Sequence, residues 1–166
     1  MGTVGRRREA EELCSIARTL EIVGDMWTLL IIREAALRGV TRFADFRAGL
    51  GIAPDLLSAR LASLVDAGVM EKRPYREPGA RTRDSYHLTP AGEDLRLVLA
   101  ALQQWGDDNR PPSVGPTILR RSAGPGRPVR VAFVDDTDAV VAPDDVRFTD
   151  GGTGASLRPP AGSSHG

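Results

Sequence analysis

Cysteine and histidine are almost absent from this sequence, which removes several classes of functional site. Among 166 residues there is one cysteine, Cys14, and there are two histidines, His87 and His165. A single cysteine excludes an intrachain disulfide and every multi-cysteine zinc site. The histidines are far apart in the sequence, so no metal cluster or histidine-based catalytic set is visible. We therefore expect a protein that is not an enzyme and that holds no metal and no cofactor.

Long hydrophobic runs are also missing. The run TLLII at residues 28–32 is far too short to span a bilayer, and the basic residues of the N-terminal segment are not followed by an apolar run. We expect no signal peptide, no membrane partner and a cytoplasmic location. The composition, 41% hydrophobic and 27% charged, is typical of soluble globular proteins, and the length suggests one domain plus an appendage.

Net charge is absent overall but not locally. The chain has 22 basic and 22 acidic residues, yet the segment KRPYREPGARTR at residues 72–83 has five basic residues around one acid, Glu77. The five are Lys72, Arg73, Arg76, Arg81 and Arg83. Such an excess indicates either a solvated charged loop or a surface that binds a polyanion.

Apolar periodicity predicts four helices in the first part of the chain. They cover residues 9–23, 26–38, 41–49 and 54–67. The first has a stripe at spacings of three and four, and the fourth points three leucines inward. The stripe is Leu13, Ile16, Leu20 and Val23, and the inward set is Leu57, Leu61 and Leu64. Asp25 is the predicted N-cap of the second helix, and Pro54 stands in the first turn of the fourth.

After Gly68 the helical period is lost, and the pattern predicts a β-hairpin. VMEKRPY at residues 69–75 and DSYHL at residues 84–88 are its strands, and the Pro78-Gly79 pair marks the turn between them. Thr89 and Pro90 then resemble the N-cap and first residue of a long helix. Along that helix, apolar residues recur at spacings of four and three, a pattern that favours a helix–helix interface. They are Ala91, Leu95, Val98, Leu102 and Trp105.

The composition changes after Asn109. Residues 110–116 are typical of a linker, residues 117–149 contain short β-like runs that predict a small β-rich appendage, and residues 150–166 are rich in Gly, Ser and Pro and predict a disordered tail. Nothing in the appendage identifies a ligand.

Residues 9–109 together predict a winged helix-turn-helix, so the fold class is mainly α (α+β), with a long C-terminal dimerisation helix and the β appendage. A major groove admits one helix, and the basic hairpin beside it can place cations on phosphates. The fourth helix and the basic hairpin therefore predict a nucleoid-associated protein that binds double-stranded DNA. The candidate contacts outside the hairpin are Arg42, Asp55, Ser58, Ala59 and Arg60.

The ordered motifs across residues 13–107 resemble the HxlR-type winged-helix transcriptional regulators, relatives of the MarR group. These motifs are Cys14, Gly24 and Trp27, followed by TRFADF, LLSARLASLVDAG, RPY and YHLTPAG. The resemblance implies a homodimeric bacterial regulator, a repressor that acts near its own gene and responds to a small-molecule or electrophile inducer. It also implies pairing of the protomers through the terminal helices. The expected interface is Leu13, Ile16, Leu20, Leu95, Val98, Leu102 and Trp105.

The fourth helix departs from the family pattern in ways that affect DNA reading. Ala53 stands where the family commonly has Ser or Thr, so the N-cap hydrogen bond is expected to be missing, with Pro54 compensating in part. Asp55, Ala59 and Ala62 should point outward, with Ser58 at the flank. Asp55 could accept from cytosine and alanines could touch thymine methyl groups, but strong base readout is lacking. We expect DNA shape and phosphate contacts to supply much of the selectivity.

Several assignments stay open at this level. Arg60 can contact a phosphate or pair internally with Asp66 or Glu71, and Arg42 carries a similar choice. The seam of the last helix can pair two protomers or dock on its own core. The hairpin can bind DNA as the wing of a regulator, or an acidic protein partner if the domain is a protein–protein interaction module.

Three side chains have a functional and a structural reading. Cysteines at the place of Cys14 sense electrophiles or oxidants in some family members, whereas a free cysteine can also simply fill core space. Any disulfide would have to join two protomers or a small thiol. Trp27 and Trp105 can line a ligand pocket or pack in the core, and packing is favoured. His87 is expected at the surface.

Overall fold

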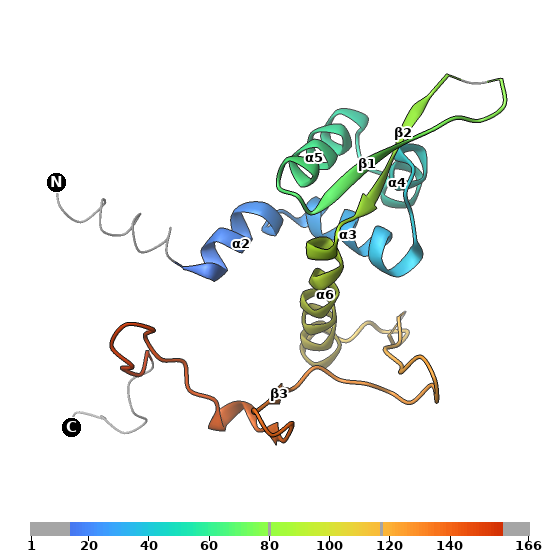
Figure 1. The fold of residues 1–166 in the computed structure, drawn as a ribbon. Helices are drawn as coiled ribbons and strands as arrows, with labels where there is room; N and C mark the ends of the chain where they lie inside the picture. The colour runs from blue at the N-terminus through green and yellow to red at the C-terminus, as the bar shows by residue number, and fades with distance from the viewer. Residues whose placement is uncertain (1–13, 80, 117, 158–166) are drawn as a thin grey trace. The chain divides into compact units, whose positions relative to one another are not determined.

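The computed structural model describes residues 14–79, 81–116 and 118–157, and the chain divides into two compact units at Trp105. Among the described residues, the N-terminal unit has four helices, a two-stranded hairpin and most of a fifth helix (Figure 1). In order these are α2 (Ser15–Val23), α3 (Met26–Arg38), α4 (Phe43–Leu50), α5 (Pro54–Asp66), β1 (Met70–Tyr75), β2 (Arg83–Leu88) and α6 (Pro90–Asn109). The predicted order of helices and hairpin is confirmed. Residues 9–13 of the first predicted helix lie outside the described residues.

The helix ends follow local chemistry. The Oδ1 atom of Asp25 accepts hydrogen bonds from the backbone N–H groups of Trp27 and Thr28, at 3.0 and 3.3 Å, so the predicted N-cap of α3 is confirmed. Gly39 ends the helix in the left-handed conformation, with φ of 66°, which glycine adopts without steric cost. Ala53, by contrast, begins α5 without a side-chain cap hydrogen bond, as the sequence indicated.

The hairpin is joined to the helices by a third extended segment. β1 pairs with β2 in antiparallel register, with Lys72 opposite Tyr86 and Arg73 opposite Ser85. On the other side of β2, the N–H of Tyr86 donates to the carbonyl of Thr41 at 2.7 Å, and Arg42 forms a bridge with Ser85. The base of the hairpin is therefore anchored directly to the segment that begins α4.

α6 starts where the chain passes closest to β1. The Thr89 hydroxyl donates to the carbonyl of Gly68 at 2.6 Å and accepts from the N–H of Gly92 at 3.2 Å, so Thr89 is the N-cap that the sequence predicted. A Cβ at Gly92 would lie 2.2 Å from the carbonyl oxygen of Val69. Only glycine permits this approach between α6 and the residue that precedes β1.

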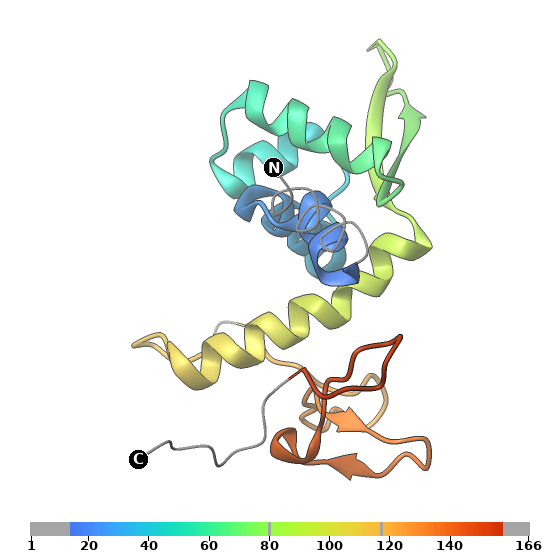
Figure 2. The ribbon, with the colours of Figure 1, turned by 90° about the vertical axis from the view of Figure 1, so that its left-hand side faces the viewer.

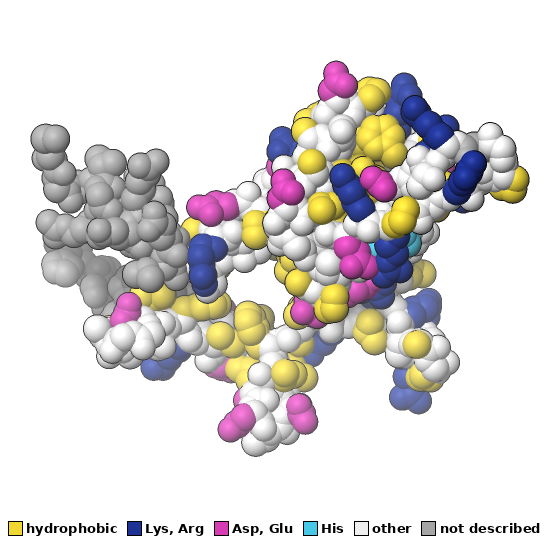
Figure 3. Space-filling model, turned by 45° about the horizontal axis from the view of Figure 1, so that its top comes forward, with side chains coloured by type: hydrophobic (Ala, Val, Ile, Leu, Met, Phe, Trp, Pro, Cys, Tyr) yellow, Lys and Arg dark blue, Asp and Glu magenta, His cyan; other side chains and the backbone are white. Residues whose placement is uncertain are grey.

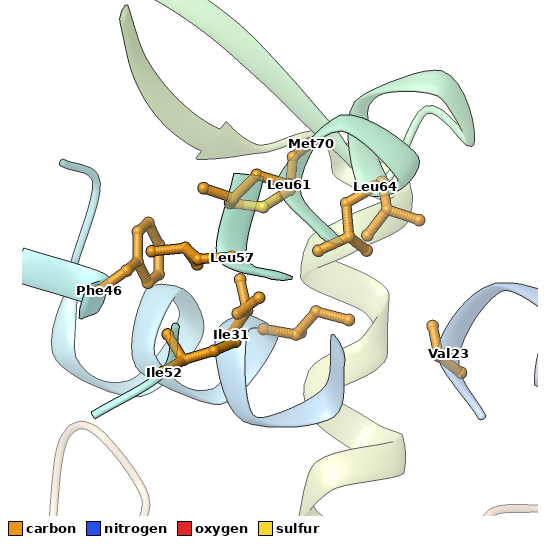
Figure 4. Packing of buried hydrophobic residues seen from close by; sticks show 10 residues of the cluster. Val23, Ile31, Phe46, Ile52, Leu57, Leu61, Leu64 and Met70 are labelled. Carbon is orange, nitrogen blue, oxygen red and sulfur yellow. The ribbon is translucent and has the colours of Figure 1, made fainter. Parts of the chain in front are cut away.

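The core lies between α3, α4, α5 and the start of β1 (Figure 4). Side chains from all four elements meet there with no exposed surface or almost none: Ile31, Ile32, Phe46, Leu57, Leu61, Leu64 and Met70. The three inward leucines predicted for the fourth helix are confirmed. Because this core holds α5 by one face, the opposite face is left to solvent. Figures 1 and 2 show the hairpin extending beyond the helices beside α5.

The C-terminal unit has little regular secondary structure and no buried core among its described residues. It begins with the last turn of α6 and contains one short antiparallel hairpin, β3 (Phe133–Val134) and β4 (Val140–Val141), and a 3₁₀ turn at Pro143–Asp145. None of its described residues is buried. Residues 150–157, the start of the predicted tail, form a hydrogen-bonded turn, and residues 158–166 lie outside the described part.

Candidate nucleic-acid interface

The exposed face of α5 is the first part of the candidate interface. Asp55, Ser58, Ala59 and Ala62 are all exposed, as the inward leucines required. The Ser63 hydroxyl donates to the Ala59 carbonyl within the helix, at 3.0 Å. The face therefore presents to solvent the carboxylate of Asp55, the hydroxyl of Ser58 and the methyl groups of two alanines.

Arg60, at the edge of this face, forms an internal ion pair whose partner the sequence did not predict. Its Nη2 atom lies 3.1 Å from Oδ2 of Asp25, whereas Asp66 and Glu71 had been the expected partners. Asp25 thus caps α3 with one carboxylate oxygen and holds α5 with the other. Because the two residues are 35 positions apart, periodicity carried no signal for the contact.

Arg42 joins the start of α4 to the tip of the hairpin. Its Nη1 atom lies 2.7 Å from Oε1 of Glu77, and its guanidinium stands 4.8 Å from the centre of the Tyr75 ring. Both partners come from the hairpin, and the Arg42 side chain remains 48% exposed. Arg42 is therefore placed beside the hairpin cations in the folded protein.

The basic side chains of the hairpin differ in whether an acidic side chain pairs with them. Arg73 donates from Nε and Nη2 to Oε1 of Glu71, at 2.8 and 2.6 Å. Arg81 and Arg83 are exposed and make no ion pair with any residue that the structure describes. Figure 3 shows Lys and Arg side chains gathered over the hairpin. The guanidinium groups of Arg81 and Arg83 are therefore open to solvent and to an anion.

The apolar residues expected at a dimer interface divide into two groups. Those that are exposed on α2 and α6 are Ile16, Leu20, Val98, Leu102 and Trp105. Leu95 is half-buried and packs against its own core, so its place in the interface stays a prediction, and Leu13 lies outside the described residues. The sequence reading missed Ile22 and Leu97, which are also exposed, because they lie off the predicted spacings.

For four other side chains, the burial predicted from the sequence can be compared with the structure. Cys14 is free and exposed at the N-cap of α2, which contradicts the core-filling reading. Trp27 packs against the core as expected, but Trp105 is exposed. His87 is half-buried rather than on the surface, and its Nε2 atom lies 2.9 Å from the Ser85 hydroxyl.

The part of the chain that the structure describes shows neither a metal-binding cluster nor a membrane-spanning helix. No group of three or more His, Cys, Asp or Glu side chains could hold a metal ion there. None of the described helices is long and apolar enough to cross a membrane.

A helix pair, a solvent-facing second helix and a basic hairpin anchored beside it define a winged helix-turn-helix protein. The sequence profile described as HxlR-like helix-turn-helix matches residues 22–114, and the chain belongs to that family.

Individual relatives agree with this assignment. An HTH-type transcriptional regulator of Mycobacterium tuberculosis, Rv3095, named as uncharacterised, is 45% identical over 107 residues, which are 64% of this chain and 66% of that protein. The match thus spans just under two thirds of that relative. The crystal structure of PA1607, a proposed transcription factor, superposes with a TM-score of 0.70 and 35% identity over 82% of this chain and 94% of that one. The redox regulator HypR in its reduced form gives a TM-score of 0.51 and 25% identity over 58% of this chain and 94% of that one.

Proposed function

We propose that the protein is a transcriptional regulator that binds double-stranded DNA, with α5 in the major groove and the β1–β2 hairpin as a wing on the phosphate backbone. The observation that carries this proposal is the pair of exposed guanidinium groups of Arg81 and Arg83, which form no ion pair with the described residues and lie in the hairpin beside a solvent-facing α5. Arg42, Lys72 and Arg76 lie in or beside the same hairpin. The name of the mycobacterial relative supports the same function.

The wing should supply much of the affinity, because α5 offers few groups for base readout. Each phosphate contact releases counterions, so binding should weaken steeply with salt. In a mobility-shift assay on promoter-proximal DNA, replacing Arg81 and Arg83 with Ala should weaken binding across all sequences. The slope of log affinity against log salt should fall by about 2, at about 0.9 for each contact.

A matched control removes the same charge elsewhere. Arg127 and Arg130 are exposed in the C-terminal unit, and replacing both with Ala should leave DNA affinity unchanged. Salt-insensitive or absent DNA binding by the wild type would overturn the proposal and favour the rival function, a module whose basic hairpin binds an acidic protein partner.

We also propose that the regulator acts as a homodimer on a palindromic operator, as a repressor near its own gene. The support is the set of exposed apolar side chains on α2 and α6, which would otherwise stay in water. A two-fold dimer would present two α5 helices to half-sites about 34 Å apart, one turn of DNA.

Sedimentation tests the dimer directly. Replacing Val98 and Leu102 with Glu should give a monomer that binds a palindromic site much more weakly than wild type. Val114→Glu is the control, because this apolar side chain is 87% exposed in the C-terminal unit. A wild-type monomer at micromolar concentration would exclude the dimer.

A reporter gene placed behind the protein's own promoter tests whether the protein represses or activates transcription.

Cys14 is the candidate sensor within this function. Its thiol is exposed, and HypR, one of the structural relatives, is named a redox regulator. Diamide should release DNA from the wild type but not from Cys14→Ser, and the oxidised product should be a disulfide between two protomers or with a small thiol. Equal release from both proteins would eliminate the sensor role.

A further inference from the structure

One ion pair links α5 to another element, and it is the only such side-chain link among the residues that the structure describes. The Nη2 atom of Arg60, in the middle of α5, lies 3.1 Å from Oδ2 of Asp25. The hydrogen bond from Ser63 to Ala59 stays within the helix. No other residue of α5 forms a side-chain hydrogen bond or ion pair with the described residues. A single directed contact therefore ties α5 to the start of α3.

The other contacts of α5 define its orientation less sharply. Leu57, Leu61 and Leu64 have no exposed surface and decide which face of the helix is buried. Hydrophobic burial is non-directional, whereas a hydrogen bond to a charged group requires a defined distance and angle. The first turn adds no such bond, because Ala53 caps it without a side-chain hydrogen bond. The ion pair is thus the contact that depends most steeply on how α5 is rotated.

The side chain of Arg60 is partly enclosed by the protein. Its Nε atom is buried and has no hydrogen-bond partner among the described residues. The side chains of Arg60 and Asp25 are 35% and 36% exposed, so both partners are mostly covered. Salt screens a partly buried pair much less than a pair in open solvent. The contact should therefore persist at the salt concentrations that weaken phosphate binding.

A small rotation of α5 is large on the scale of a hydrogen bond. With its side chains, a helix has a radius of about 5–6 Å, so a rotation of about 10° moves a side chain on its surface by about 1 Å. Hydrogen-bond lengths span only about 0.5 Å. Such a rotation would displace the polar groups of Asp55 and Ser58 on the exposed face. Arg81 and Arg83 belong to the hairpin and would not turn with the helix.

We propose that Asp25 and Arg60 are positioning residues, which fix the rotation of α5 against α3 and thereby set the preference of the protein for one DNA sequence over others. The second half rests on the proposed function, since only a helix that binds DNA can prefer a site. The pair should matter little for affinity to DNA of unrelated sequence, because phosphate contacts of the wing supply that affinity.

The orientation of α5 is tested on the full-length chain without DNA. Asp25→Asn keeps an oxygen for the cap of α3 but removes the charge, and Arg60→Met keeps an unbranched stem but removes the donors. Residual dipolar couplings of the N–H and Cα–Hα bonds of α3 and α5 report the orientation of one helix against the other. We expect a rotation of about 10° or more in both variants, enough to break the contact. An unchanged orientation in the folded variants would overturn the proposal.

A matched control breaks an ion pair that does not involve α5. Glu93 and Arg96 pair within α6, where Oε2 and Nε are 2.6 Å apart. Glu93→Gln makes the same charge change as Asp25→Asn and should leave α5 in its wild-type orientation. If Asp25→Asn does not fold, Arg60→Met still tests the pair, because it leaves the cap of α3 intact.

Selectivity is measured as the ratio of the affinities for promoter-proximal DNA and for a shuffled duplex of the same composition. Asp25→Asn and Arg60→Met should each lower this ratio by at least about threefold, with affinity for the shuffled duplex and the salt slope unchanged. The two substitutions change the net charge in opposite directions, so charge alone cannot explain a shared loss. The double variant should lose no more than either single variant, because the same contact is removed.

A direct phosphate contact by Arg60 predicts a different pattern. Arg60→Met would then weaken binding to both duplexes and lower the salt slope by about 0.9, whereas Asp25→Asn would strengthen binding by releasing the guanidinium. This pattern, or an unchanged ratio in both variants, would overturn the positioning role.

Failure of this inference is distinguishable from failure of the proposed function. DNA binding by the wild type, with an unrotated α5 in both variants, overturns the positioning role and leaves the regulator intact. A rotated α5 in the variants of a protein that binds no DNA overturns the regulator and leaves the first half of the inference. A wild type that prefers neither duplex overturns the second half.

Discussion

At the scale of single residues, the acid inside the wing limits its positive charge. Glu77 is the only acidic residue in the segment 72–83, and its carboxylate forms an ion pair with the guanidinium of Arg42. A DNA phosphate that approaches Arg42 must compete with this carboxylate. If the hairpin contacts DNA as we propose, Glu77 should lower the affinity of this set of cations for the phosphate backbone.

Replacing Glu77 with Gln should strengthen DNA binding several-fold at low salt, because it frees Arg42 and removes a repelling charge. The salt slope should rise by about 1, which corresponds to one added phosphate contact. Fluorescence anisotropy across a salt series measures both quantities. Asp136→Asn makes the same charge change in the C-terminal unit and should have no effect, and an unaltered affinity in Glu77→Gln would contradict this account.

Asp25 shows how one carboxylate can serve two elements. Replacing it with Ala removes the N-cap of α3 and leaves the guanidinium of Arg60 without its partner. We expect unfolding by urea to show a loss of about 1–3 kcal/mol. Asp25→Asn should lose less, since an amide oxygen still caps a helix. A larger loss in the Asn variant than in the Ala variant would show that the cap is not the main contribution.

At the scale of elements, Gly92 allows the start of α6 to lie against the backbone of Val69, the residue before β1. A methyl group there would collide with the carbonyl of Val69 at 2.2 Å and press on the side chain of Leu88. Gly92→Ala should therefore destabilise the protein by about 1–3 kcal/mol, although alanine is the better helix former.

The control lies in the same helix. No atom stands within 4 Å of a Cβ built at Gly106, so Gly106→Ala should stabilise α6 by up to about 1 kcal/mol. Thermal unfolding of both variants separates the steric effect from helix propensity. Equal stabilisation by the two substitutions would show that α6 does not press on Val69.

The turn after β3 should respond to pH. The hydroxyl of Thr137, and then the N–H groups of Thr137 and Ala139, donate to Asp135 and lower the pKa of its carboxyl below the usual 3.8. A lowered pKa in the folded state means that the turn is stabilised at neutral pH. This stabilisation is lost as the pH falls through that lowered value.

NMR chemical shifts of Thr137 and Ala139 should report this transition below pH 3.8. They should move little between pH 5 and 8. Asp135→Asn should abolish the transition, while Asp136→Asn should preserve it. A midpoint above the usual value would contradict the assignment.

At the scale of the whole molecule, the two units contribute unequally to stability. Every buried hydrophobic residue of the described chain lies before Trp105, and the C-terminal unit leaves Phe133, Val134 and Phe148 exposed. Hydrophobic burial is the main source of folding free energy, so the N-terminal unit should carry nearly all of it. A chain that ends at Asn109 should therefore unfold within a few degrees of the full-length protein and keep its DNA affinity. Calorimetry and anisotropy test this, and a collapse of the melting temperature would show that the C-terminal unit covers part of the core.

The sequence alone determined the helices and the hairpin of residues 15–109, the N-caps of α3 and α6, and the buried face of α5. These features depend on residues a few positions apart, where helical period, a capping carboxylate or a turn glycine acts locally. Family motifs fixed the order of the elements and the position of the wing.

Only the tertiary structure decided which charges meet. Asp25 with Arg60, and Arg42 with Glu77, join residues 35 positions apart. Leu95 of α6 packs in part against the core of its own domain. A periodic pattern specifies which side of an element is buried, but not which side chain of another element it will face, because that depends on how the elements pack in three dimensions.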